Sequence, residues 1–195
     1  YSGTEDLVEK THQVLYDSLG ALDLEPEKVL FGVPENWSMD DNLKEPYLKL
    51  LNKMLKDYDL SPMAYVTTTN SLSYLLQKQE GSPPTAILLG LGEYVEITLV
   101  KGGRIIGSRS LKRTDNLFED IEKTLQQFTE VEVLPSKILL YGTKSGGDLS
   151  KMHDNLMSYP WMAKLSFLHF PKIEILANDV LYQSVIFAGC SELYP

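Results

Sequence analysis

The stretch TAILLGLGEYVEITLVKGGRIIGSRSL, residues 85–111, decides the fold class that we predict for this chain. Residues 86–89 form a short apolar run, and residues 94–100 alternate between apolar and polar side chains, as half-buried strands do. Residues 101–103, Lys-Gly-Gly, predict a tight turn, because paired glycines adopt positive φ without steric cost. Residues 104–110 then resume an extended pattern, so the stretch predicts three consecutive strands joined by short turns.

The first of these turns, Gly90-Leu91-Gly92-Glu93, has two interpretations. Glycines allow backbone N–H groups to approach a phosphate, which makes Gly90 and Gly92 candidate nucleotide contacts. Glycines are also the ordinary residues of a hairpin turn, and turn chemistry favours that simpler interpretation. The sequence leaves both open.

The part of the chain before this stretch predicts helices alternating with strands. Its expected order is a helix over 4–19, a strand over 29–33, a helix over 41–58, a strand over 62–67, and a helix from Thr68 or Thr69 through 77. Strands separated by helices imply parallel pairing with right-handed crossovers. Residues 80–84, Glu-Gly-Ser-Pro-Pro, form a linker that we expect to be a hinge.

The part after this stretch repeats that alternation. Its expected order is a helix over 116–129, a strand over 137–141, a helix over 148–158, a strand over 172–176, and a helix over 179–189. The first block therefore matches the second with its three opening strands removed. We predict two lobes of an α/β protein: 1–79 as a partial first lobe, 85–176 as the second, and 177–195 as a C-terminal helix returning to the first.

Composition excludes several classes of function. The chain has 195 residues and a formal net charge of −9, with lysines and arginines scattered, which argues against nucleic acid as the main ligand. Its single cysteine, Cys190, excludes an internal disulfide framework, and we expect it to be a small buried residue of the last helix. No apolar run approaches the ~20 residues of a membrane span. The chain begins with Tyr1, from which we expect a piece of a longer polypeptide.

Four segments resemble motifs of the actin-like ATPase superfamily, whose lobes have a ribonuclease-H-like fold. The segment VLFGVPENWSMD resembles a strand ending in Val-Pro, and ILLGLGEYVEITLV aligns without gaps with the second phosphate-binding hairpin. The segment KILLYGTKSGGDLSKMHDNL resembles the adenosine motif, and DVLYQSVIFAGCSEL resembles the helix that returns to the first lobe. Spacing and the lack of large insertions are most similar to the PilM and FtsA branch. The resemblance implies a two-lobed fold whose first lobe lacks its three N-terminal strands.

Departures from the family pattern bear on catalysis. The resemblance places Leu89 where active members carry the Asp that holds Mg²⁺ through water, and Tyr94 where they carry a Thr. Leucine offers no oxygen to a hard cation. Thr69-Asn70-Ser71 occupies the segment that usually carries a Glu near the catalytic water. We therefore expect no catalytic residue, no metal site and little or no ATP hydrolysis.

Two further clusters are candidate sites. The glycine-rich turn after the strand over 137–141 offers Gly142, Thr143, Gly146 and Gly147 as nucleotide contacts, or it is only a strand-to-helix connection. An aromatic segment offers a patch for a protein partner, or it is core packing around the last strand. Its candidate partner-binding residues are Tyr159, Trp161, Phe167 and Phe170.

The resemblance implies a degenerate actin-like scaffold of bacterial pilus assembly or cell division. Such a protein is cytoplasmic, binds protein partners that include membrane-embedded assembly components, and in some members self-associates. The alternative is a nucleotide-binding ATPase that takes ATP and Mg²⁺, with its first phosphate loop upstream of this chain. A weaker third hypothesis is a relic of a sugar or acid kinase.

Overall fold

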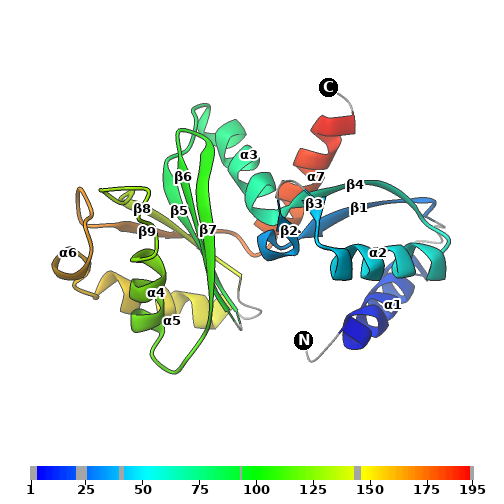
Figure 1. Ribbon diagram of the computed structural model, residues 1–195, viewed down its shortest axis with the longest axis horizontal. Coiled ribbons are helices and arrows are strands. Elements are labelled where there is room, and N and C mark those ends of the chain that lie inside the picture. The colour runs from blue at the N-terminus through cyan, green and yellow to red at the C-terminus, as the bar shows by residue number, and fades with distance from the viewer. Residues whose placement is uncertain (1–3, 21–25, 40–41, 93, 143–145, 194–195) are drawn as a thin grey trace. The chain divides into compact units, whose positions relative to one another are not determined.

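The computed structural model describes residues 4–20, 26–39, 42–92, 94–142 and 146–193. The chain divides into two compact units, of which the first ends at Val66 and the second begins at Thr67. Each unit is described here by itself (Figure 1). The hinge predicted over residues 80–84 stays a prediction, because where a fold divides into compact units does not determine where it bends.

The described residues of the first unit form two small two-stranded sheets and two longer helices. Its elements are α1 (Thr4–Gly20), β1 (Lys28–Val33), a short 3-10 turn (Glu35–Trp37), β2 (Ser38–Met39), β3 (Asn42–Leu43), α2 (Glu45–Asp57) and β4 (Ser61–Thr67). β1 pairs with β4, and β2 pairs with β3 in antiparallel register. The helix predicted over residues 41–58 therefore begins late, since a two-residue strand precedes it and Pro46 stands in its first turn.

A local apolar cluster stabilises this first unit. Val33 of β1 packs with Leu50, Leu51 and Met54 of α2, and partly buried aromatic side chains surround them. Trp37 belongs to that surrounding layer and stacks on Tyr47, with ring centroids 4.4 Å apart.

The second unit contains a mixed five-stranded sheet in the order β7-β6-β5-β8-β9. Its elements are α3 (Thr68–Glu80), β5 (Ala86–Leu91), β6 (Tyr94–Lys101), β7 (Arg104–Lys112), α4 (Leu117–Leu125), β8 (Lys137–Tyr141), α5 (Gly146–Met157), α6 (Trp161–Lys164), β9 (Lys172–Ile175) and α7 (Val180–Leu193). β5, β6 and β7 pair antiparallel, whereas β8 and β9 join β5 in parallel. The three predicted strands and the Gly102-Gly103 turn, with φ of 57° and 75°, are confirmed. The turn predicted over residues 90–93 begins later, because Gly90 and Leu91 pair with β6 as the last two residues of β5.

Both faces of this sheet are covered, as a sheet with parallel strands requires. On one face, alternate residues of β5 and β6 pack with Ile121 and Leu125 of α4 and with Leu149 and Leu156 of α5. On the other face, the remaining residues pack with α3 and with Val180 of α7. Figure 1 shows α3 and α7 on one side of the sheet and α4 and α5 on the other.

Several helix ends differ from their predicted positions because side chains cap them differently. Thr67, not Thr68 or Thr69, caps α3: its hydroxyl accepts the Asn70 N–H at 3.3 Å. α3 continues to Glu80, where Gly81 at φ 65° ends it and Lys137 of β8 pairs with the Glu80 carboxylate.

The other helix corrections lie in the second half of the chain. α4 ends at Leu125, four residues before the predicted 129, and α7 extends to Leu193 rather than 189. α5 begins at Gly146, ahead of the predicted Asp148, and α6 was not predicted. No helix among the described residues is long and apolar enough to cross a membrane.

Candidate functional site

The predicted nucleotide glycines gather where β5 and β8 end. These strands pair in parallel, and the register sets Gly90 beside Tyr141. Because parallel strands present their carboxyl ends at one edge of the sheet, Gly92 and Gly142 follow at that same edge. Ligands of open α/β sheets bind at such an edge, so this is the position at which a phosphate loop would act.

Gly90 is buried under a tyrosine ring. A Cβ at Gly90 would lie 2.9 Å from both Cζ and Oη of Tyr141, closer than non-bonded atoms tolerate. Tyr141 is itself buried and belongs to the core shared with α3 and α7. The space that makes glycine necessary at this position is therefore taken by the protein's own side chain.

Gly92 lies in a turn whose hydrogen bonding is local. Its N–H donates to the Tyr94 carbonyl at 3.0 Å, and nothing lies within 4 Å of where its Cβ would be. Glu93, the next residue, is outside the described residues. The contacts of Gly92 are those of a hairpin turn.

Gly142 needs glycine for its backbone conformation. Its φ is 101°, outside the range that L side chains adopt easily, and a Cβ there would lie 3.4 Å from the backbone of Leu91. Gly146 and Gly147 are the first two residues of α5, and Thr143 lies outside the described residues. The sequence-predicted glycines thus converge on one edge, while their role as nucleotide contacts stays a prediction.

Two side chains at this edge received no role in the sequence analysis. Tyr141 ends the predicted strand, but only the parallel register reveals that its ring covers Gly90. Glu96 of β6 stands opposite Gly90 in the antiparallel register, and burial raises the pKa of this carboxyl above its usual range. Leu89, at the position where the resemblance expects a metal-holding Asp, is a core residue. Among the described residues, no three His, Cys, Asp or Glu side chains are grouped as a metal site.

The predicted aromatic patch is mostly core. Trp161 is fully buried, and its indole N–H donates to the Leu156 carbonyl at 2.7 Å. Phe167 is buried and meets Trp161 edge to face, with ring centroids 6.2 Å apart. The prediction that these two side chains bind a partner is wrong, because both fill the interior. Phe170 is 49% exposed, and its role in binding stays a prediction.

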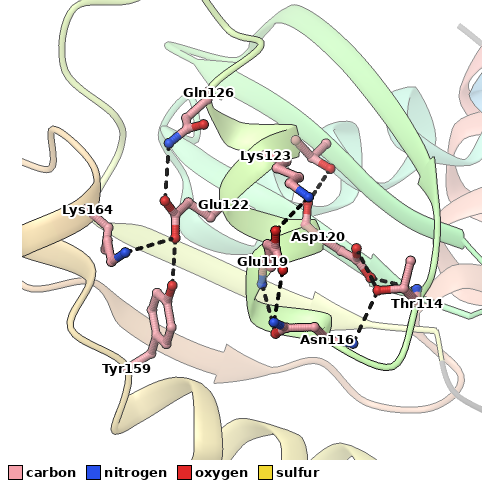
Figure 2. Close-up of polar contacts among 10 residues, drawn as sticks. Thr114, Asn116, Glu119, Asp120, Glu122, Lys123, Gln126, Tyr159 and Lys164 are labelled. Carbon is pink, nitrogen blue, oxygen red and sulfur yellow. Dashed lines mark hydrogen bonds and ion pairs between the residues drawn. The ribbon is translucent and has the colours of Figure 1, made fainter.

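Tyr159 is half-buried, and its contacts connect the segment after α5 to α4. Its hydroxyl donates to Glu122 of α4 at 2.7 Å (Figure 2). Its ring stacks on Phe118. The hydrogen bond to Glu122, followed by burial, raises the pKa of Tyr159 to about 12. Nearby, the Asp120 carboxylate accepts from both the N–H and the hydroxyl of Thr114, which fixes the connection from β7 to α4.

Cys190 is exposed on α7, so the expectation of a buried thiol is also wrong. Apolar side chains on the same helix are exposed as well, which a buried last helix would not show. They include Tyr182, Ile186 and Phe187.

This arrangement defines a class of protein by its fold. A five-stranded mixed sheet with β5, β6 and β7 antiparallel and β8 and β9 parallel is the ribonuclease-H-like unit. The chain has the actin-like ATPase fold, and the described residues of its first unit form no counterpart of the three-stranded antiparallel stretch of the second.

Solved structures support that assignment. EutJ, an ethanolamine utilization protein from Carboxydothermus hydrogenoformans, is similar at a TM-score of 0.58 and 8% identity, over 93% of this chain and 72% of that chain. An inorganic polyphosphate/ATP-glucomannokinase from Arthrobacter sp. strain KM is similar at 0.54 and 15% identity, over 98% and 85%. The PilM–PilN type IV pilus biogenesis complex contains a chain similar at 0.50 and 12% identity, over 75% of this chain and 59% of that one.

Comparison of the amino-acid sequence with known families and proteins identifies no relative of this chain. No protein-family model matches the chain, and no curated protein matches it. At identities of 8–15% the similarity establishes the fold alone.

Proposed function

We propose that this chain is a degenerate actin-like module that acts as a protein-binding scaffold and hydrolyses little or no ATP. One observation carries the proposal: the ring of Tyr141 fills the space over Gly90. A phosphate that approached the backbone at Gly90 would need the same space, because close approach to a backbone is what a glycine permits.

The residue types at this edge support the same conclusion. Leu89 is buried in the core, so no carboxylate extends from that position toward a Mg²⁺ ion. Gly92 already donates its N–H to the Tyr94 carbonyl. Burial raises the pKa of the Glu96 carboxyl above its usual range, because taking a carboxylate out of water disfavours its charged form.

The similar structures suggest what kind of partner such a scaffold binds. PilM occurs in a complex with PilN, so a protein of this fold binds another protein in type IV pilus biogenesis. By analogy, we propose protein partners for this chain, with membrane-embedded assembly components among them. A cytoplasmic location, at the inner face of the membrane through such partners, follows from the same analogy.

The alternative function is nucleotide binding, with a first phosphate loop upstream of this chain. Convergence of Gly90, Gly92, Gly142 and the start of α5 at one sheet edge favours it, since helix starts and glycine turns bind anions. The similar glucomannokinase is named for its use of ATP. The closed space over Gly90 is the reason we rank this alternative second.

Calorimetric titration of this chain with ATP and with ADP, each with Mg²⁺, tests the choice between these two functions. The scaffold function predicts no saturable heat of binding up to about 1 mM nucleotide. Any residual affinity would then be weaker than that of ordinary cofactor sites. Micromolar binding that Gly142→Val abolishes would establish the alternative. The matched control is Gly102→Val, because Gly102 also has positive φ but lies in the turn at the other end of β6.

A further inference from the structure

β7 is a terminal strand of the five-stranded sheet and has pairing capacity left on its outer side. The order β7-β6-β5-β8-β9 gives it one neighbour, β6 (Figure 1). In the described part of the chain, no backbone hydrogen bond from another segment reaches residues 104–112. An edge strand of 9 residues presents unpaired N–H and C=O groups to any extended segment that approaches it.

The charge along this edge is opposite to that of the whole chain. Lys101, Arg104, Arg109, Lys112 and Arg113 follow one another with no acidic residue between positions 97 and 114, in a chain of net charge −9. Although the basic residues are scattered over the chain as a whole, these five form a local run. It makes the β7 edge attractive to a negatively charged segment.

Most of these charges are available to a partner. Arg109 is engaged, since it pairs with Glu130 at 2.6 Å and lies over the Phe128 ring. Within the described residues, no ion pair forms on Lys101, Arg104, Lys112 or Arg113.

Ile106 of β7 lies at the rim of an apolar cavity of about 280 Å³, whose other lining residues belong to the end of β6, to Thr85 and to residues 131–136 and 168–169. The register passes from Leu99 opposite Gly107 to Val100 opposite Ile105, so Ile106 is the extra residue of a β-bulge. A bulge re-aims a side chain, and Ile106 lines the cavity together with Val133 and Leu168, both well exposed. The volume is below the usual ~300–1,000 Å³ of small-molecule sites, so it suits a single side chain better than a cofactor.

A second copy of this chain fits the edge poorly, because both edges would carry the same run of basic residues with no acidic residue between positions 97 and 114. Antiparallel self-pairing centred on Ser108 would set Arg104 opposite Lys112, and like charges directly opposite are destabilising. An acidic strand reverses both contacts into attractive pairs. The edge therefore selects against itself and for a negatively charged partner.

We propose that β7 is the docking edge for an extended acidic segment of a partner protein. The segment adds to the sheet as a strand beside β7 and places one apolar side chain in the cavity beside Ile106. This inference rests on the proposed scaffold function and names the surface that function uses.

The test is selection of random nonamer peptides by display on the full chain. Enriched sequences should carry acidic residues next to an apolar one, and their binding should weaken steeply as salt is raised. Hydrogen exchange should show new amide protection within residues 104–112 when a selected peptide is bound. The variant Arg104→Glu/Lys112→Glu should weaken that binding roughly tenfold or more.

The matched control is Lys53→Glu/Lys56→Glu, which reverses two exposed charges on α2 and should change binding less than about twofold. Salt dependence and exchange protection need no variant, so they decide the matter even if a charge reversal fails to fold. Failure to enrich any peptide, enrichment of sequences without acidic residues, or β7 protection by a second copy alone would overturn the proposal. Protection at α7 instead would also overturn it while leaving the scaffold function standing, which nucleotide titration tests separately.

Discussion

At the carboxyl ends of β5 and β8, Tyr141 fills the space over Gly90, whereas at the amino end of β5, Thr85 borders an apolar cavity of about 280 Å³. The first region carries the glycines that resemble a ligand loop, and the second carries no motif. The difference teaches that glycine marks where backbone and neighbour approach closely, but not whether the neighbour is a ligand or a side chain.

Removing the Tyr141 side chain should produce the largest loss of stability. A small loss would mean that the two regions of the sheet do not differ in the way described. Tyr141→Ala empties a buried position between β8 and α3, so we expect a loss of about 3–5 kcal/mol in the free energy of unfolding. Urea denaturation monitored by circular dichroism measures this change. The control Tyr182→Ala removes a ring that is 74% exposed and should stay within about 0.5 kcal/mol. A loss under about 1 kcal/mol for Tyr141→Ala would mean that the ring does not close this edge.

Gly90 of β5 and Gly92 of the turn that follows sharpen the same point. Gly90→Ala forces a Cβ against the Tyr141 ring, and such overpacking should cost about 1–3 kcal/mol. Gly92→Ala meets no atom within 4 Å and should be neutral or slightly stabilising. Denaturation of both variants, and of Gly90→Ala combined with Tyr141→Ala, measures the coupling between ring and glycine. Equal losses at the two glycines would contradict the packing described here.

A pH series at Glu96 should give a smaller effect. Burial raises the folded-state pKa above 4.5, so folding favours the neutral carboxyl. The contribution of Glu96 to stability is therefore full below the unfolded pKa and is lost as pH rises through the folded one. Glu96→Gln keeps a neutral side chain at every pH. The variant should therefore be more stable than the wild type at pH 7, and the two stabilities should converge near pH 3. Thermal melts of both proteins across that pH range measure this difference. A difference in melting temperature that widens toward low pH would contradict the prediction.

The smallest effect is expected at the rim of the cavity. Leu168 is 67% exposed, so Leu168→Ala should change the free energy of unfolding by less than about 0.5 kcal/mol. Affinity for a selected acidic peptide should nevertheless fall, because the apolar side chain at the cavity mouth is lost. Stability and affinity that fall together would indicate that Leu168 is part of the core rather than of a binding surface.

Much of the second unit could be predicted because its patterns are local. Alternation over residues 94–100 and the Gly102-Gly103 turn determine neighbouring strands, and the run over 137–141 predicts β8 at its true bounds. Helix ends were less predictable, since they depend on which hydroxyl caps the first turn, as Thr67 does for α3.

The candidate site was less predictable because it depends on contacts between distant residues. The parallel register that sets Gly90 beside Tyr141 joins positions 51 residues apart in the sequence. Burial of Trp161 and Phe167 likewise depends on how the segment after α5 folds back over the sheet. Aromatic composition is the same in a core and at an interface, so it could not separate the two.

Calorimetric titration of ATP with Mg²⁺ into this chain tests the central claim most directly. Closure of the space over Gly90 by Tyr141 predicts no saturable binding up to about 1 mM nucleotide, the limit of weak association. Saturable micromolar binding that is lost in Gly142→Val and retained in Gly102→Val would contradict the account and identify a nucleotide site at the ends of β5 and β8.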